Sequence, residues 1–187
     1  MSYGLTAYTL NRGMLAQACG EGMELYEEIL ADDRGRITSL GGQLDVDVDR
    51  ALRELLSGAG DGDGRAHAYA LELVCRRLAL PLTNRALYPA RLDLLDAIDA
   101  ALADADHPDG FSLARLALAG PPVPLPARPD FPSIGWIDLA CTKAFAERWR
   151  EAPTEPEDPR LADAIAEVAV WAQTASAEGE GLIGFYY

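Results

Sequence analysis

Apolar residues recur at helical spacing through most of the chain, with polar residues on the opposite side of each predicted helix. Residues 65–80 are the most apolar of these segments, because apolar side chains occupy most of the circumference there. A helix that is apolar nearly all round belongs in the interior of a helical body. The same periodicity predicts helices over residues 11–19, 23–32, 47–56, 90–104, 111–119, 139–150 and 159–177.

Capping residues and glycines predict where these helices begin and end. Asp47, Asp138 and Asp158 each precede an apolar periodic segment, and their carboxylates can accept hydrogen bonds from the first backbone N–H groups of a helix. Residues 34–44 contain several glycines, so this segment is predicted to be a loop.

Both ends of the chain have the composition of strands. Residues 3–10 and 182–187 are short and rich in aromatic and β-favouring side chains. A lone strand leaves its backbone groups unpaired, so we expect these strands to pair with each other or with residues 134–137. The patterns predict an α+β fold: a mostly helical single domain over residues 1–187, with a small sheet formed by the N- and C-terminal strands and a third strand near residues 134–137 as a further option.

Residues 120–135 hold half of the chain's 12 prolines. If they were a linker, the part of the chain after them would be short for a core of its own. As a polyproline-II segment, residues 121–132 would span about 37 Å at about 3.1 Å per residue, roughly one domain diameter. We therefore expect a stiff strap across one globule, although the P-x-x-P spacings also permit binding to an aromatic groove. Asp130, Phe131 and Trp136 are candidate contact residues in and beside this segment.

The chain is strongly acidic, with 30 acidic residues against 16 basic ones and a net charge of −14. Such a charge repels nucleic acid and anionic membrane surfaces. An acidic surface keeps many soluble proteins dispersed, and it also suits a basic protein partner. The leading hypothesis is a non-enzymatic interaction protein of inhibitor or immunity type. The sequence does not distinguish a monomer from an oligomer.

The segment 65–91 has a positive net charge, unlike the chain as a whole, because arginines outnumber acidic residues in it. The guanidinium groups of Arg76, Arg77 and Arg85 can bind a carboxylate or a phosphate. The alternative hypothesis is therefore a small anionic-ligand-binding protein, or an enzyme of unrecognised type, with a pocket near His67, Arg76 and Arg77. The simpler interpretation is that these arginines pair with the acidic segments of neighbouring helices.

Known catalytic and metal-binding patterns are absent or incomplete. Residues 179–184 match G-x-G-x-x-G, but they follow a helix and open a strand, the reverse of a dinucleotide site. Asp45, Asp47 and Asp49 begin like a calcium loop that lacks its glycine and its final glutamate, so capping and turn roles are expected. His107 lies in a polar turn and is expected to be solvated. We assign no catalytic residue, no cofactor and no metal ligand.

Cys19, Cys75 and Cys141 are widely spaced and form no C-x-x-C pair, a pattern typical of free thiols in a reducing cytoplasm. The N-terminus shows no signal-peptide pattern, and no apolar stretch is long enough to span a membrane. A cytoplasmic protein that does not bind membranes is predicted.

Four segments together resemble a known family: residues 1–5 (MSYGL), 68–72 (AYALE), the proline-rich 120–135 and the closing 179–186 (GEGLIGFY). Over most of its length the chain is similar to uncharacterised actinobacterial proteins that are grouped only as a domain of unknown function. The resemblance implies a bacterial cytoplasmic protein. It carries no known activity, so it transfers no functional residue to this chain.

Overall fold

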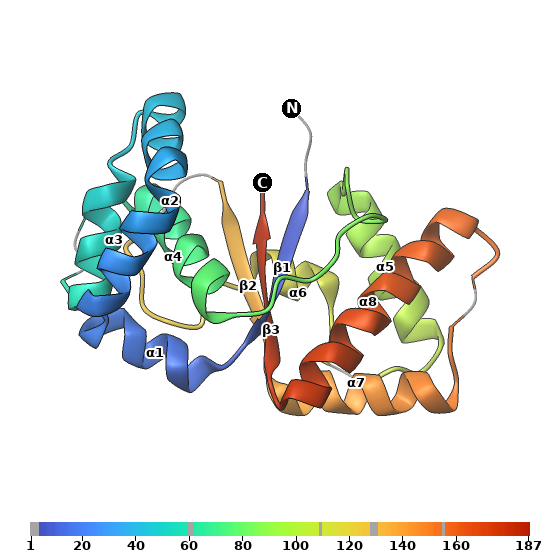
Figure 1. Ribbon diagram of the computed structural model, residues 1–187. Helices are drawn as coiled ribbons and strands as arrows, with labels where there is room; N and C mark the ends of the chain where they lie inside the picture. Colours follow the sequence, from blue (N-terminus) through green and yellow to red (C-terminus); the bar gives the residue numbers. More distant parts are fainter. Residues whose placement is uncertain (1–3, 60–61, 109, 128–130, 155) are drawn as a thin grey trace. The chain divides into compact units, whose positions relative to one another are not determined.

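The computed structural model describes residues 4–59, 62–108, 110–127, 131–154 and 156–187. Within these ranges the chain packs as two compact units (Figure 1). The sheet unit comprises Met1–Asn11, Leu80–Pro122 and Ser133–Tyr187, and the helical unit comprises Arg12–Ala79 and Val123–Pro132. Each unit is built from segments that are far apart in the sequence.

A three-stranded antiparallel sheet is the centre of the sheet unit. β3 (Gly181–Tyr186) lies between β1 (Leu5–Leu10) and β2 (Ser133–Ile137) and pairs with both. The predicted pairing of the terminal strands, and the third strand near residues 134–137, are therefore confirmed. The outer edge of β1 is also paired, because its backbone exchanges hydrogen bonds with residues 80–82.

The described helices of the sheet unit are α5 (Leu92–Asp104), α6 (Leu113–Leu118), α7 (Leu139–Glu151) and α8 (Pro159–Glu178). The predicted N-caps of the last two are confirmed. Asp138 accepts a hydrogen bond from the Cys141 N–H at 2.8 Å, and Asp158 accepts one from the Arg160 N–H at 2.9 Å. The core of the unit includes Trp171 of α8, which is 1% exposed and whose indole N–H is satisfied by a backbone carbonyl.

Two glycines allow α6 to approach the sheet closely. Gly135 of β2 and Gly184 of β3 are directly opposite each other in the strand register. A Cβ at Gly135 would lie 2.6 Å from the carbonyl carbon of Leu116, and one at Gly184 would lie 2.9 Å from the Leu116 side chain. Any other residue at these two positions would therefore push α6 away from the sheet.

The helical unit contains α1 (Arg12–Glu21), α2 (Met23–Leu44), α3 (Val48–Ser57) and α4 (Gly64–Leu78) among its described residues. α4 is the interior helix that the apolar pattern predicted, since every residue from Ala66 to Cys75 is buried. α3 and α4 each contact α1 and α2 as well as one another. The predicted cap of α3 is confirmed, because Asp47 accepts a hydrogen bond from the Arg50 N–H at 2.9 Å.

The predicted loop over residues 34–44 is wrong, because α2 continues through it to Leu44. The backbone departs from helical geometry only at Asp33 (φ −112°, ψ 15°), and Ile37 is 6% exposed. Each glycine inside a helix costs about 1 kcal/mol relative to alanine. Burial of Ile37 supplies about 1.5–3 kcal/mol against that loss.

The proline-rich segment contributes its residues 123–132 to the helical unit. Residues 120–127, 131 and 132 are in neither helix nor strand, and Val123 is 5% exposed. The backbone passes directly against the start of α4: a Cβ on Gly64 would lie 2.7 Å from the carbonyl carbon of Ala127. The backbone at Pro126 and Ala127 is therefore packed against the first turn of α4.

Candidate functional site

His67 lies in the first turn of α4, inside the helical unit. Asp63 is the N-cap residue of this helix, and its carboxylate accepts a hydrogen bond from the Arg65 N–H at 2.8 Å. His67 lies on an apolar face of α4 and is 0% exposed. A buried imidazole needs partners for both ring nitrogens, so those partners decide what the residue can do.

Only one of these nitrogens has a hydrogen-bond partner among the described residues. Nδ1 lies 2.9 Å from the backbone carbonyl oxygen of Asp63, which also accepts the His67 N–H at 3.0 Å. A carbonyl oxygen can only accept, so Nδ1 is the donor and carries a proton. In the neutral ring Nε2 is then a lone-pair acceptor, and it is buried with no hydrogen bond to any described residue.

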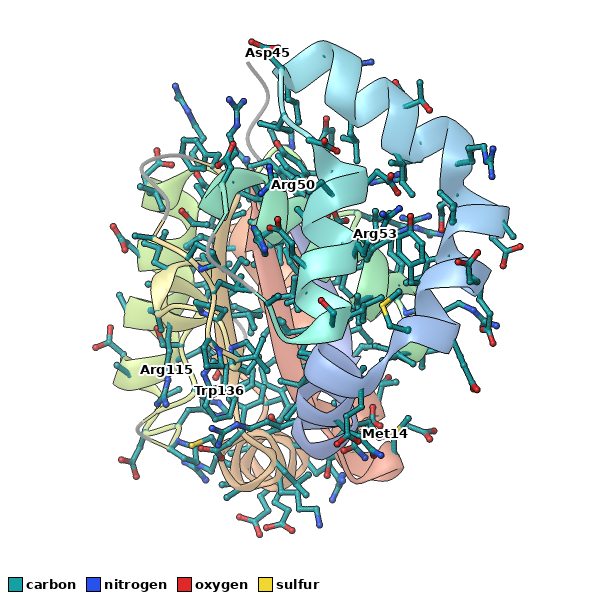
Figure 2. All side chains as sticks on the ribbon, turned by 90° about the vertical axis from the view of Figure 1, so that its left-hand side faces the viewer. Met14, Asp45, Arg50, Arg53, Arg115 and Trp136 are labelled. Carbon is teal, nitrogen blue, oxygen red and sulfur yellow. The ribbon has the colours of Figure 1, made fainter. Side chains whose placement is uncertain are left out.

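Glu54 of α3 faces this nitrogen. Its Oε2 lies 3.4 Å from Nε2 of His67, and its Oε1 accepts a hydrogen bond from Nε of Arg50 at 2.6 Å. Arg50 extends from the same helix, as Figure 2 shows. The approach of the two side chains requires a glycine at position 62, because a Cβ on Gly62 would lie 2.6 Å from Oε2 and 3.1 Å from Cε1 of His67. The Glu54–His67 pair is thus built from α3, from the turn after it and from the start of α4.

A pocket of about 240 Å³ lies beside the Glu54–His67 pair. A smaller hollow of about 130 Å³ is bordered by the same two side chains and by Asp63. Carboxylate and imidazole form the polar part of the pocket, and its apolar part comes from α1, α3 and the proline-rich segment. The pocket is lined by Ala16, Cys19, Glu54, Leu55, Gly58, His67, Val123, Pro124 and Pro126.

Cys19 adds a thiol to the wall of the pocket. It lies where the regular part of α1 ends, because the backbone leaves helical geometry at Cys19 and at Gly20, where φ is 139°. Burial raises the pKa of Cys19 to about 11. The group is therefore a protonated thiol near neutral pH, not a thiolate nucleophile.

The arginines proposed from the sequence lie elsewhere. Arg76 and Arg77 are exposed in the last turn of α4, roughly 14 Å along the helix from His67 at 1.5 Å per residue. Arg77 forms an ion pair with Glu28 of α2 at 2.6 Å, as the simpler interpretation expected for these arginines. Arg85 is part of the sheet unit, where its backbone N–H donates to Glu167 at 2.8 Å.

The candidate contacts of the proline-rich segment are also distinct from the pocket. Asp130 lies outside the described residues. Phe131 is 38% exposed and does not line the pocket. Trp136 is half-buried in β2 of the sheet unit. The contact roles predicted for these residues stay predictions.

A family model for the domain of unknown function DUF7691 matches residues 1–187. The chain belongs to this family. Comparison with curated proteins and with solved structures gave no match. The DUF7691 description assigns no activity, so function has to be argued from the pocket.

His107 of this DUF7691 chain is not solvated, contrary to the expectation from its polar turn. It is 8% exposed, and its ring centroid lies 4.9 Å from that of Phe145 and 6.0 Å from that of Trp149. Its Nε2 lies 2.9 Å from the hydroxyl oxygen of Thr154. Burial, followed by the charge of Arg148, lowers the pKa of His107. Aromatic side chains of α7 cover the turn, a tertiary contact that local polarity does not reveal.

The residues of the pocket that the sequence did not reveal are Glu54, Cys19 and the segment 123–126. One local sequence pattern could have indicated the pocket: a histidine lies one turn after a glycine-rich connection, and a glutamate lies near the end of the preceding helix. No group of three or more His, Cys, Asp or Glu residues in the described ranges could hold a metal ion. Across the same ranges, no helix is both long and apolar enough to cross a membrane.

Proposed function

We propose that this DUF7691 chain is a small-molecule-binding protein whose site is the Glu54–His67 pocket. The observation that carries the proposal is Nε2 of His67, which is buried beside a carboxylate with no hydrogen bond to any described residue. Leaving such a group unsatisfied costs about 1–3 kcal/mol. A bound molecule that hydrogen-bonds to Nε2 would recover that free energy.

The size and walls of the pocket limit what it can hold. At about 30 Å³ per water, about 240 Å³ corresponds to roughly eight waters, so the ligand is small. Leu55, Val123 and Pro124 present apolar surface, and the polar groups are concentrated at Glu54 and His67. This arrangement of an apolar wall with a few convergent polar groups is typical of ligand sites. The same pair could exchange a proton with a bound substrate, which keeps an enzyme of unrecognised type within the proposal.

A thermal-shift screen of metabolites tests the proposal, with anionic, neutral and cationic compounds represented equally. A true ligand at about 100 times its Kd adds about 2.7 kcal/mol of stability. For a chain of this size that corresponds to a rise of about 5–10 °C in Tm. Failure of every compound class to stabilise the chain would refute the proposal.

Two matched variants locate the site. Ala16→Phe places a large side chain in the pocket, and Ala31→Phe makes the same change on an exposed position of α2. We expect a ligand to stabilise the wild-type chain and Ala31→Phe, but not Ala16→Phe. Equal stabilisation of both variants would place the ligand outside this pocket.

We also propose, as the second candidate, an interaction protein with an acidic surface for a basic protein partner. Glu24, Glu28 and Asp32 recur every four residues along α2 and are all exposed, so they form one acidic stripe. Charge reversal at Glu24 and Asp32 leaves the Glu28–Arg77 ion pair in place. A purified basic partner should bind the wild-type chain with a salt-dependent Kd and should bind the reversed variant much more weakly. A stoichiometric partner whose affinity is the same for both would contradict the acidic-stripe proposal.

A further inference from the structure

We infer that the pocket recognises a small protonated amine, an inference that rests on the proposed small-molecule function. The ammonium group would bind at the Glu54–His67 pair, and a short apolar chain would lie along the wall formed by Leu55, Val123 and Pro124. The inference depends on which hydrogen-bonding roles the pocket leaves unfilled.

Both unfilled roles are acceptors. The Asp63 carbonyl oxygen holds the proton on Nδ1 of His67, so that Nε2 of the neutral ring offers a lone pair. Oε2 of Glu54 lies 3.4 Å from that nitrogen and is also an acceptor, while Oε1 is occupied by Arg50. In the neutral ring, these two acceptors have no donor between them among the described residues.

An ammonium group supplies what these two acceptors lack. It has three N–H donors and no acceptor, so one nitrogen can donate to both Nε2 of His67 and Oε2 of Glu54. A hydroxyl has a single donor and can satisfy only one of them. Hydrogen bonds to a charged group are also about twice as strong as neutral ones.

The electrostatics favour a cation over an anion. The net charge of −14 concentrates cations around the chain. Among the described residues that line the pocket, Glu54 contributes a carboxylate and none is an arginine or a lysine. An anionic ligand would have to approach the Oε2 side of that carboxylate, since Arg50 is paired with Oε1.

Three probes with four carbon atoms each and different head groups test this choice: butylamine, butan-1-ol and butyrate. Titration of the ¹⁵N-labelled chain with each, followed by amide chemical shifts, reports both the affinity and the site. We expect butylamine to shift the amides around residues 16–19, 54–58 and 67, and butyrate to leave them unchanged. Equal or stronger binding of butan-1-ol or butyrate, or absence of any shift with butylamine, would overturn the inference.

Two variants with the same change in charge test the contact itself. Glu54→Gln keeps the shape of the side chain but removes the carboxylate, and Glu24→Gln makes the same change on an exposed position away from the pocket. Loss of a charged hydrogen bond should weaken butylamine binding by about tenfold or more in Glu54→Gln. Glu24→Gln should bind as the wild-type chain does. Wild-type affinity in Glu54→Gln would overturn the inference.

The two proposals fail in different ways. A neutral or anionic compound that stabilises the chain through the pocket, as judged by Ala16→Phe, would refute amine recognition and support small-molecule binding. Failure of the amine and of the whole metabolite screen would refute both proposals.

Discussion

Replacement of Gly135 by alanine would place a Cβ 2.6 Å from the carbonyl carbon and from the carbonyl oxygen of Leu116. Both are backbone atoms of α6, so no change of side-chain rotamer can relieve the overlap. Either α6 or β2 must shift. Because Gly184 lies directly opposite in β3, the shift would also open the contact between α6 and the central strand.

The free energy of this change can be estimated from its parts. Inserting a methyl group into a packed core costs about 1–3 kcal/mol. Alanine returns about 0.4–1 kcal/mol by restricting the unfolded chain. The contact is with backbone, so the upper part of the first range applies and the net loss is about 2 kcal/mol. With a urea slope of about 2 kcal/mol per M, the unfolding midpoint should fall by about 1 M.

Urea unfolding followed by tryptophan fluorescence is the suitable assay, because the chain's 3 tryptophans all belong to the sheet unit. Ser133→Ala, in the same strand, adds no atom and should change stability by less than about 0.5 kcal/mol. If the midpoint of Gly135→Ala matched that of Ser133→Ala, the backbone of α6 would not rest on the glycine pair.

Four further outcomes are expected. Burial lowers the pKa of His107, so between that lowered value and its ordinary value the unfolded chain binds more protons than the folded one. Unfolding free energy should therefore drop as the solution is acidified from about pH 7.5 to about pH 5.5, and His107→Gln should drop less; equal drops would contradict this. Asp99→Ala removes the acceptor for two backbone N–H groups at the start of α6, which should cost about 2 kcal/mol by urea unfolding; an unchanged midpoint would mean that these two hydrogen bonds do not stabilise the fold. Since burial raises the pKa of Cys19 to about 11, iodoacetamide should label it about a hundredfold more slowly at neutral pH than an exposed cysteine, as followed by peptide mass spectrometry; rapid labelling would show that the thiol is not buried. Leu52→Ala should destabilise the helical unit by about 2–5 kcal/mol. If residues 1–187 unfold as the predicted single domain, the urea midpoint measured by tryptophan fluorescence should fall together with the midpoint measured by circular dichroism. An unchanged fluorescence midpoint would mean that the two units unfold independently.

The parts of the fold that the sequence predicted are those controlled by neighbouring residues. Asp47, Asp138 and Asp158 act as caps because each carboxylate reaches N–H groups within the next three residues. The terminal strands could be paired because unpaired backbone groups are costly wherever they lie. The extension of α2 beyond Asp33 could not be predicted, because its glycines weaken the helix locally and the burial of Ile37 is a tertiary contact.

The candidate site also has a part that could be predicted from neighbouring residues and a part that depends on tertiary contacts. The burial of His67 followed from helical spacing, since its neighbours one turn away are apolar. Its chemical role did not, because that role depends on Glu54 and on a hydrogen bond to the Asp63 carbonyl oxygen. Charge composition instead indicated the arginines at the other end of α4. One of these, Arg77, is exposed and forms an ion pair with Glu28.

The proline-rich segment connects the predicted and unpredicted parts of the site. A stiff segment was predicted from the sequence, whereas its place in the pocket was not. A pocket wall made of ordinary residues would present backbone N–H groups that need partners, whereas Pro124 and Pro126 have none and have a fixed φ. These prolines can therefore line the pocket without competing for the acceptors at Glu54 and His67. The rigid, donor-poor wall leaves those acceptors to the ligand, which is the arrangement that recognition of a small ammonium group requires.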